Sequence, residues 1–348
     1  MGRLKVALVG GPMYDRLYDV LPDVEIVVHV DHPTLNRTVA DMLARREPID
    51  VLSTHSKYAP SQAQWLRPLD DLDVSSLAPK AVDLCTFRGS LLSLPRCIDV
   101  RVLWSVADEA PSTWEELASS SLVFGFPGRE SGLFGTFFEI VVASGGRLFD
   151  DDARPVIASV EAVRAVEILC EIALRAPEDL PDWHYDQVDT ALLEGRIEAA
   201  AAWPGGYGAI ASSGLPLQPH HYVGGVSYAG VHSWAIPKTC EDVDGARELI
   251  AWLTGEEAGR IDASGGTVPA NEKAFESVKP RDAIDARRLA ITRDTIANAM
   301  ITYPPFERFP EVEDAGWQAI NAALRGDLSP EQAVDETQTA AERAGSAR

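Results

Sequence analysis

The sequence predicts an α/β protein built as two lobes. A chain of 348 residues is too long for one ordinary domain and suits two lobes, each with its own core. Its hydrophobic fraction of 46% is that of a globular protein. Strand and helix patterns alternate through the first hundred residues, which implies a parallel sheet. No apolar run approaches the roughly 20 residues of a membrane-spanning helix, so we expect a soluble protein.

The first lobe is expected to start with a strand that runs into Gly10-Gly11-Pro12. Apolar residues at Leu35, Val39 and Leu43 recur at helical spacing and predict a helix after the second strand. The expected first-lobe elements are strands at 4–9, 24–30 and 49–52 and helices at 14–21 and 34–46.

The pattern changes from about Pro111. Ser112 or Thr113 is placed to cap a helix that begins at Trp114, with a glutamate at the matching position of a capping box. Farther along, Gly145-Gly146 is expected to end a helix. The other expected elements are strands at 122–126, 198–203 and 231–236, helices at 136–144, 160–173, 187–193 and 243–253, and a helical tail from about 282 broken at 303–305.

The charge balance excludes some partners. Acidic groups outnumber basic ones by 53 to 31, which gives a net charge of −22. A field of that sign repels phosphate backbones and anionic lipid surfaces, so we expect no nucleic-acid partner.

Known catalytic and cofactor motifs are missing, and we expect no enzyme, no cofactor and no metal. Gly10-Gly11 lacks the third glycine of a dinucleotide fingerprint, and neither a phosphate loop nor a Gly-x-Ser-x-Gly turn occurs. The neighbours His220 and His221 point apart in a helix or a strand. A carboxylate pair for glycoside hydrolysis stays open, because the separation of two carboxylates is not readable from a sequence.

The four cysteines show no metal-ligand spacing. Cys85 and Cys97 flank a short Gly-containing turn and are near enough in sequence to pair in an oxidising compartment; the sequence leaves both states open. Cys170 lies on the apolar face of a helix and is expected in the core.

The amino terminus bears on localisation. Met1, Gly2 and Arg3 lead straight into a strand, without the charged, apolar and small-residue regions of a signal peptide. Two expectations follow. Either an export signal has been removed and the protein is periplasmic or extracellular and membrane-associated, or Met1 is the native start and the protein is cytoplasmic.

Eight stretches of the chain together resemble a known family. They include Trp-Leu-Arg-Pro-Leu-Asp-Asp-Leu at 65–72, Arg-Gly-Ser-Leu-Leu-Ser-Leu-Pro at 88–95 and Ala-Pro-Ser-Thr-Trp-Glu-Glu-Leu at 110–117. The other stretches lie at 144–149, 195–205, 224–254, 265–270 and 326–333. Their order resembles that of the family 1 extracellular solute-binding proteins, the sugar-binding subunits of bacterial ABC importers.

The resemblance implies a type II periplasmic-binding-protein-like fold with hinge crossovers and a ligand cleft between the lobes. Its N-terminal lobe would comprise residues 1–103 and 231–285, and its C-terminal lobe residues 104–230 and 286–348. It also implies that a monomer binds a mono- or oligosaccharide by hinge closure and delivers it to ABC transporter membrane subunits. The alternatives are a cytoplasmic solute sensor or carrier on the same fold and a carbohydrate-acting enzyme.

A sugar site needs aromatic rings for the apolar ring faces and carboxylates or amides for the hydroxyls. In the first lobe, Tyr14 and Asp15 follow the opening strand, although Tyr14 would instead pack on the sheet if it belongs to the helix. Thr54, His55 and Ser56 end the third strand at the edge where parallel strands carry ligand contacts, and a polar run there has no evident core role.

Two second-lobe stretches add candidates. Arg129 and Glu130 lie in a polar loop between a strand and a helix, where Arg129 can grip vicinal hydroxyls or a carboxylate or can simply be solvated. Trp203 and Gly205, on either side of Pro204, are further candidates. Trp203 is expected to be a stacking platform, with packing at a strand end as its alternative role.

Candidates near the lobe crossovers complete the set. The resemblance places a carboxylate at Asp99, which contacts the ligand or pairs with a neighbouring arginine. Tyr228 and His232 lie on the return segment. We expect His232 to donate a hydrogen bond rather than bind a metal, because no second histidine sits at ligand spacing.

Overall fold

The computed structural model describes residues 2–11, 13–203 and 206–346. The chain divides into two compact units. Unit 1 comprises residues 1–99, 230–279 and 305–307, and unit 2 comprises residues 100–229, 280–304 and 308–348. Residues 280–285, expected in the first lobe, group with unit 2, because Asp282 caps a helix of unit 2 and accepts a hydrogen bond there from Tyr207.

Unit 1 is built on one five-stranded sheet with the strand order β2-β1-β3-β12-β6. β1 pairs in parallel with β2 and β3, whereas β12 runs antiparallel between β3 and β6. The amino end of β12 therefore lies beside the carboxyl ends of β3 and β6. The strands are β1 (Leu4–Val9), β2 (Val24–Val30), β3 (Val51–His55), β6 (Leu94–Asp99) and β12 (Gly230–Ala235).

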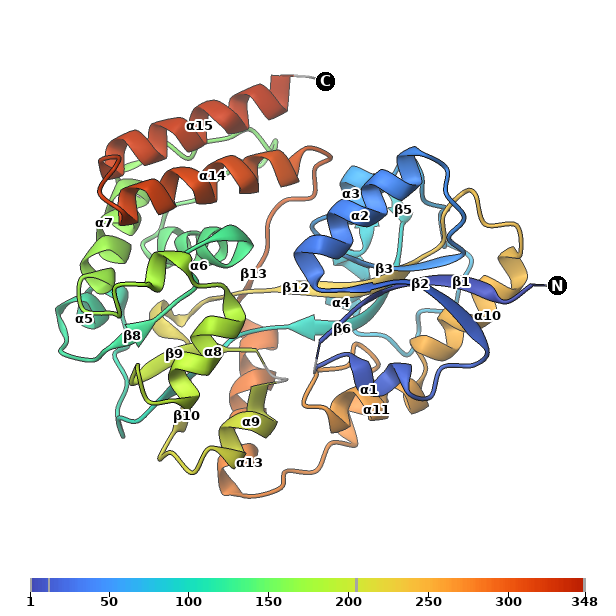
Figure 1. Ribbon diagram of the computed structural model, residues 1–348, viewed down its shortest axis with the longest axis horizontal. Helices are drawn as coiled ribbons and strands as arrows, with labels where there is room; N and C mark the ends of the chain where they lie inside the picture. The colour runs from blue at the N-terminus through green and yellow to red at the C-terminus, as the bar shows by residue number, and fades with distance from the viewer. Residues whose placement is uncertain (1, 12, 204–205, 347–348) are drawn as a thin grey trace. The chain divides into compact units, whose positions relative to one another are not determined.

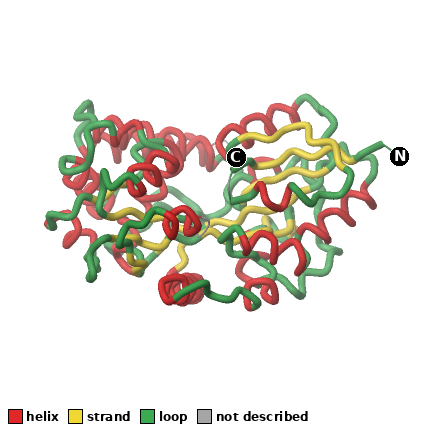
Figure 2. The backbone as a smooth tube through the Cα atoms, turned by 60° about the horizontal axis from the view of Figure 1, so that its bottom comes forward, coloured by secondary structure: helices red, strands yellow, loops and turns green. Residues whose placement is uncertain are grey.

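Helices cover both faces of this sheet (Figures 1 and 2). α2 and α3 lie on one side, and α1, α10 and α11 lie on the other (Figure 1). α2 buries Leu35, Val39 and Leu43, the predicted apolar stripe, in a core cluster with Ala7 and Leu52 of the sheet. The helices are α1 (Asp15–Tyr18), α2 (His32–Ala44), α3 (Ala59–Gln62), α4 (Pro79–Leu84), α10 (Val243–Leu253), α11 (Glu256–Ser264) and α12 (Glu272–Glu276); β4 (Thr86–Phe87) and β5 (Ser90–Leu91) form a hairpin.

Two predicted boundaries in unit 1 are wrong. α1 is a single turn rather than a helix over 14–21; Pro22 disfavours helical geometry at Leu21. β3 continues to His55 instead of ending at Leu52, since its ladder with β12 pairs His55 with His232. Thr54 and His55 are thus inside the strand, with side chains on opposite faces.

Unit 2 contains a four-stranded sheet with the order β10-β7-β9-β8, and a separate parallel pair of β11 and β13. Its strands are β7 (Val102–Ser105), β8 (Phe124–Gly125), β9 (Ala199–Ala202), β10 (Gln218–His220), β11 (Ser227–Tyr228) and β13 (Met300–Ile301). Its α-helices are α5 (Trp114–Ser119), α6 (Glu130–Ala143), α7 (Val160–Ala173), α8 (Tyr185–Leu193), α9 (Tyr207–Ser212), α13 (Ala283–Asp294), α14 (Phe309–Leu324) and α15 (Pro330–Ser346).

The start of α6 was predicted too late. The predicted capping box of α5 is confirmed, with Thr113 as the N-cap and Glu116 completing the box. α6, however, begins at Glu130 rather than near Thr136. Its early glycines serve close packing, not a loop: a Cβ at Gly132 would meet the Pro127 side chain at 2.5 Å, and one at Gly135 would meet Arg101 at 3.0 Å.

Two general expectations can be compared with the described residues. All four cysteines are free, including Cys85 at the C-cap of α4 and Cys97 within β6, both of them buried. Among the helices that the structure describes, none has the length and apolarity to cross a membrane.

Candidate functional site

Four of the predicted site residues meet at one edge of the unit 1 sheet. Tyr14 follows β1, His55 ends β3, Asp99 ends β6 and His232 lies near the start of β12. The β-ladders explain the meeting, because His232 is paired with His55 and Gly230 with Asp99. We call Tyr14, His55, Asp99 and His232 the strand-end cluster.

Short contacts link the members of this cluster. The Tyr14 hydroxyl is hydrogen-bonded to His232 Nε2 at 2.8 Å, and Asp99 Oδ2 lies 3.1 Å from the same nitrogen. The His55 and His232 rings meet edge to face with centroids 5.0 Å apart. The ring of His32, the first residue of α2, packs on both, at 4.8 Å from His232 and 5.3 Å from His55.

Three of the four cluster residues are buried, Tyr14 is partly buried, and burial shifts the pKa values of His55 and Tyr14. His55 is 5% exposed, and Asp99 and His232 are each 6% exposed. Burial, with the nearby His232, His32 and Lys57, holds the pKa of His55 well below its usual value, so its imidazole is neutral at neutral pH. Burial and the charge of Asp99 raise the pKa of Tyr14 well above its usual value, so it stays a hydroxyl that can donate a hydrogen bond.

Two atoms of the cluster retain unused hydrogen-bonding capacity. Among the described residues, Asp99 Oδ1 and His232 Nδ1 have no hydrogen-bond partner, although both are buried. Buried polar atoms in native proteins are nearly always paired, so such exceptions point to ligand contacts. The two atoms are available to a solute.

Gly230 makes room for the cluster. A Cβ at this position would lie 2.1 Å from His55 Cε1 and 2.2 Å from His55 Nε2. The imidazole edge thus packs directly on the glycine backbone of β12. Any larger residue would push His55 out of its place.

The other first-lobe candidates have internal partners. Asp15 Oδ1 accepts a hydrogen bond from the Gly11 backbone and pairs with His29 at 2.9 Å. Thr54 donates to Gln62 Oε1 at 2.8 Å on the buried face, and Ser56 Oγ accepts from the Val231 backbone. The polar run at the end of β3 therefore does have a structural role, contrary to our expectation.

In unit 2, Trp203 is held by an aromatic ring and a buried cation. Its ring meets Tyr185 at a centroid distance of 5.5 Å, and the Arg101 guanidinium lies 5.1 Å from its centroid. Arg101 is itself fixed by Glu139 and Thr136, each at 3.0 Å. A cation against a tryptophan ring is an attractive contact, and it fixes the orientation of the partly buried indole.

Arg129 and Glu130 form an ion pair at the start of α6. Arg129 Nη1 lies 2.7 Å from Glu130 Oε1, and Arg129 Nε donates to the carbonyl of Asp182. Glu130 has a φ of 55°, in the left-handed region that non-glycine residues rarely adopt. Strain of this kind is concentrated at functional sites. His184 Nε2 lies 3.5 Å from the second oxygen of Glu130.

The last two second-lobe candidates are Tyr228 and Gly205. Tyr228 is a buried ring packed on Tyr303 at 4.8 Å and on Phe138 at 6.3 Å, and its backbone N–H donates to Glu139. This packing is that of a core residue. Gly205 lies outside the described residues.

Three neighbours of the candidates were missed in the sequence. His32 follows β2 by two residues, so it lies at the same strand edge as His55 and a search of every strand end would have included it. Tyr185 and Asp189 are one helical turn apart on α8, so they share a face of the helix, and the Tyr185 ring contacts Trp203. Burial and the charge of Asp186 raise the pKa of Asp189 to about 7, and shifted carboxylates are common at binding sites.

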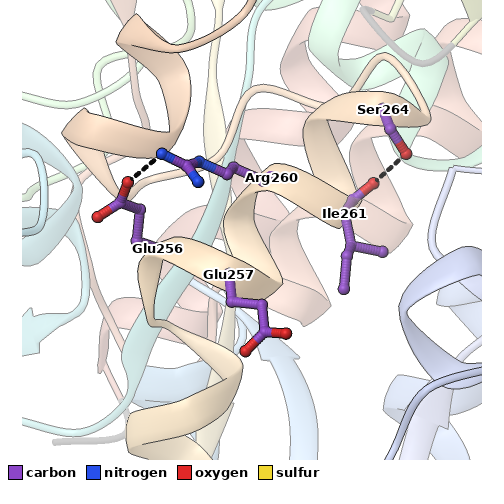
Figure 3. Close-up of a pocket in the computed structure, with 5 residues that line it drawn as sticks. All are labelled: Glu256, Glu257, Arg260, Ile261 and Ser264. Atoms are coloured by element: carbon purple, nitrogen blue, oxygen red, sulfur yellow. Dashed lines mark hydrogen bonds and ion pairs between the residues drawn. The ribbon is translucent and has the colours of Figure 1, made fainter.

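A surface hollow beside α11 differs in chemistry from the strand-end cluster and from the surroundings of Trp203 (Figure 3). It is lined by Glu256, Glu257, Arg260, Ile261 and Ser264. Its arginine is paired with Glu256, and the Ser264 hydroxyl donates to the Ile261 carbonyl within the same helix. With no aromatic ring in its lining, the hollow offers no platform for a sugar.

The sequence matches a family model and is similar to relatives of known type. Residues 22–260 match the model described as bacterial extracellular solute-binding protein. A probable amino-acid ABC transporter periplasmic-binding protein of Sinorhizobium fredii is 25% identical over 276 residues. That match takes in 72% of this chain, and the chain spans 63% of the relative's length.

Solved structures share the fold over nearly the whole chain. T. maritima MalE3 with bound maltose has a TM-score of 0.86 and 21% identity, covering 98% of this chain and 99% of its own. A solute-binding protein of Thermotoga lettingae with α-D-tagatose also scores 0.86 at 17% identity, covering 99% and 100%. One of Agrobacterium radiobacter K84 with ribitol scores 0.83 at 20% identity, covering 98% of each chain.

Proposed function

The chain belongs to the bacterial extracellular solute-binding proteins, and from that premise we propose that it binds a mono- or oligosaccharide and does not convert it chemically. The observation that carries the choice of a sugar is the setting of Trp203. Its indole is fixed by Tyr185 and by the buried Arg101, with Asp189 on the same helix as Tyr185. An oriented ring beside hydrogen-bonding groups suits the apolar face and the hydroxyls of a sugar.

The strand-end cluster supplies the second set of contacts in this proposal. Asp99 Oδ1 and His232 Nδ1 are free to bond hydroxyls, and charged acceptors make the stronger hydrogen bonds. A hinge motion of the chain accompanies binding in this proposal. Binding at micromolar strength corresponds to about 8 kcal/mol, which a stacked ring and a few well-oriented hydrogen bonds can supply.

The proposed partners follow from the family and its relatives. The loaded protein, a monomer in the periplasm or outside the cell, delivers its solute to ABC transporter membrane subunits. Relatives of the same fold hold maltose, tagatose and ribitol, and these ligands support a polyhydroxylated solute. Because one relative is named as an amino-acid transporter binding protein, amino acids are the ligand class against which sugars should be compared.

A ligand screen tests the proposal. Thermal shifts should be measured with mono- and disaccharides, polyols, sugar acids and amino acids, followed by calorimetry on each hit. At least one sugar or polyol is expected to raise the melting temperature, and its recovery unchanged after incubation would fit binding without turnover. Shifts with amino acids alone, or release of a new product, would contradict the proposal.

Replacement of Trp203, the proposed stacking platform, gives the first mutational prediction. Trp203→Ala should abolish the sugar-induced shift, because the ring contact with the sugar is lost. The ligand-free melting temperature should fall as well, because the contacts of the indole with Arg101 and Tyr185 are lost, so the sugar response is measured relative to each protein's own ligand-free value. Trp317→Ala is the matched control, since Trp317 is a partly buried tryptophan of unit 2 on α14 whose indole N–H bonds Asp314. An undiminished sugar response in Trp203→Ala would remove Trp203 from the site.

A further inference from the structure

The strand-end cluster has the composition of a metal site. His55, Asp99 and His232 each offer one ligand atom, and these atoms all lie within 4.8 Å of one another. The sequence argument against a metal, that no second histidine sits at ligand spacing, does not hold in space. His55 and His232 are 177 positions apart in the chain and face each other across the β3–β12 ladder.

The surroundings favour a cation. Asp99 Oδ1 and His232 Nδ1 are buried without a hydrogen-bond partner among the described residues. With the ring proton on Nε2, which lies 3.1 Å from Asp99 Oδ2, His232 Nδ1 has a lone pair to give. The three residues come from three adjacent strands, and sites on regular elements are held more precisely than sites on loops.

From this geometry we propose that the strand-end cluster binds one divalent transition-metal ion of the zinc type through His55, Asp99 and His232. Two imidazoles and a carboxylate suit zinc, at metal–ligand distances of about 2.0–2.2 Å. Tetrahedral ligands at such distances lie about 3.4 Å apart, so small side-chain rotations close the cluster onto the ion. Three protein ligands leave a coordination position that an oxygen of a bound solute can take.

We expect zinc binding to change a hydrogen bond at His55. The Lys57 backbone N–H donates to His55 Nδ1 at 3.2 Å, so the neutral ring carries its proton on Nε2. Coordination through Nδ1 leaves that proton on Nε2 and replaces this long hydrogen bond with a metal–nitrogen bond. Tyr14 stays beside His232, where its hydroxyl can bond a ligand of the ion.

Metal titration of the full-length protein tests the inference. After chelator treatment and dialysis, zinc binding is measured by calorimetry and by metal analysis, and cobalt(II) binding by visible absorption. One ion per chain is expected, with the intense cobalt bands of a tetrahedral site. His55→Gln, Asp99→Asn and His232→Gln should each weaken zinc binding by more than about tenfold, because loss of even an outer-shell partner costs 10–100-fold.

His221→Ala is the matched control. It removes an exposed imidazole that also lies beside a carboxylate, 3.6 Å from Asp294, but outside the cluster. It should bind zinc like the wild type. No stoichiometric binding by the wild type, octahedral cobalt bands, or equal losses in His221→Ala and the cluster variants would overturn the inference. The wild-type cobalt spectrum decides the matter even if a cluster variant does not fold.

The inference and the proposed function fail separately. The sugar screen is run with chelator and again with one equivalent of zinc. A sugar response in chelator, with no zinc binding by the protein, would contradict the metal site alone. Zinc binding without any sugar response would contradict the proposed function alone.

Discussion

Asp189 shows how a single side chain links stability to the candidate site. Its carboxyl lies on α8 one turn from Tyr185, and its pKa is raised to about 7 because burial and Asp186 disfavour the charged form. In the unfolded chain an aspartate titrates near pH 4. Between those two values the folded protein holds a proton that the unfolded chain has lost, so the contribution of this one carboxyl to stability is greatest below about pH 4 and falls as the pH rises to about 7.

Asp189→Asn should remove this decrease of stability with rising pH. The wild type is expected to lose up to about 1.4 kcal/mol per pH unit across that window from this group, less where water still reaches the carboxyl. The variant should therefore be more stable by about 1–3 kcal/mol at pH 8, with a smaller gain at pH 5. Urea unfolding at both pH values measures it. Glu194→Gln, an exposed change at the C-cap of α8, should alter stability by less than about 0.5 kcal/mol, and a gain for Asp189→Asn that does not grow with pH would refute the linkage.

At the scale of elements, local patterns located regular segments and missed elements shaped by distant partners. The strands at 4–9 and 24–30 and the helix at 243–253 were predicted with the observed bounds, since each has a continuous apolar pattern between clear breaks. The end of β3 was missed because only pairing with β12, far along the chain, extends it. The start of α6 was missed because glycines used for close packing resemble a loop in sequence.

The same contrast between local sequence patterns and contacts with distant segments applies to the candidate site. Tyr14 and His55 were chosen by their place at strand ends, Asp99 by the family resemblance and His232 by its place on the return segment. Their mutual contact could not be predicted, because it depends on the insertion of β12 between β3 and β6. Whether they bind a solute stays a prediction, as it does for Arg129, Glu130 and Trp203.

The glycine at the start of β12 gives the prediction at this scale. Gly230→Ala places a methyl group about 2 Å from the His55 ring, so it should destabilise the protein by about 1–3 kcal/mol and weaken zinc binding by displacing the ring. Gly208→Ala is the matched control: its Cβ meets nothing within 4 Å, and alanine in helix α9 should be neutral or stabilise by up to about 1 kcal/mol. Urea unfolding and the zinc titration measure both; equal behaviour of the two variants would contradict the close contact.

At the scale of the whole chain, unit 1 is not continuous in sequence. Its sheet needs residues 1–99 for four strands and residues 230–279 for β12, which lies between β3 and β6 and carries the fully buried Trp234. The intervening residues 100–229 belong to unit 2. Because Asp99 and Gly230 are paired neighbours on antiparallel strands, a hairpin turn can join the two segments directly.

This topology predicts which fragment folds. Residues 1–99 alone should show no cooperative unfolding, because β3 and β6 lack the strand that joins them and their buried faces stay open. Residues 1–99 fused through a short Asn-Gly turn to residues 230–279 should unfold cooperatively in urea, followed by circular dichroism and tryptophan fluorescence. The matched control is the same fusion with residues 230–235 replaced by a Gly/Ser segment of equal length, which retains every helix but lacks the strand. Cooperative unfolding of that control, or of residues 1–99 alone, would show that β12 is not required to complete the sheet.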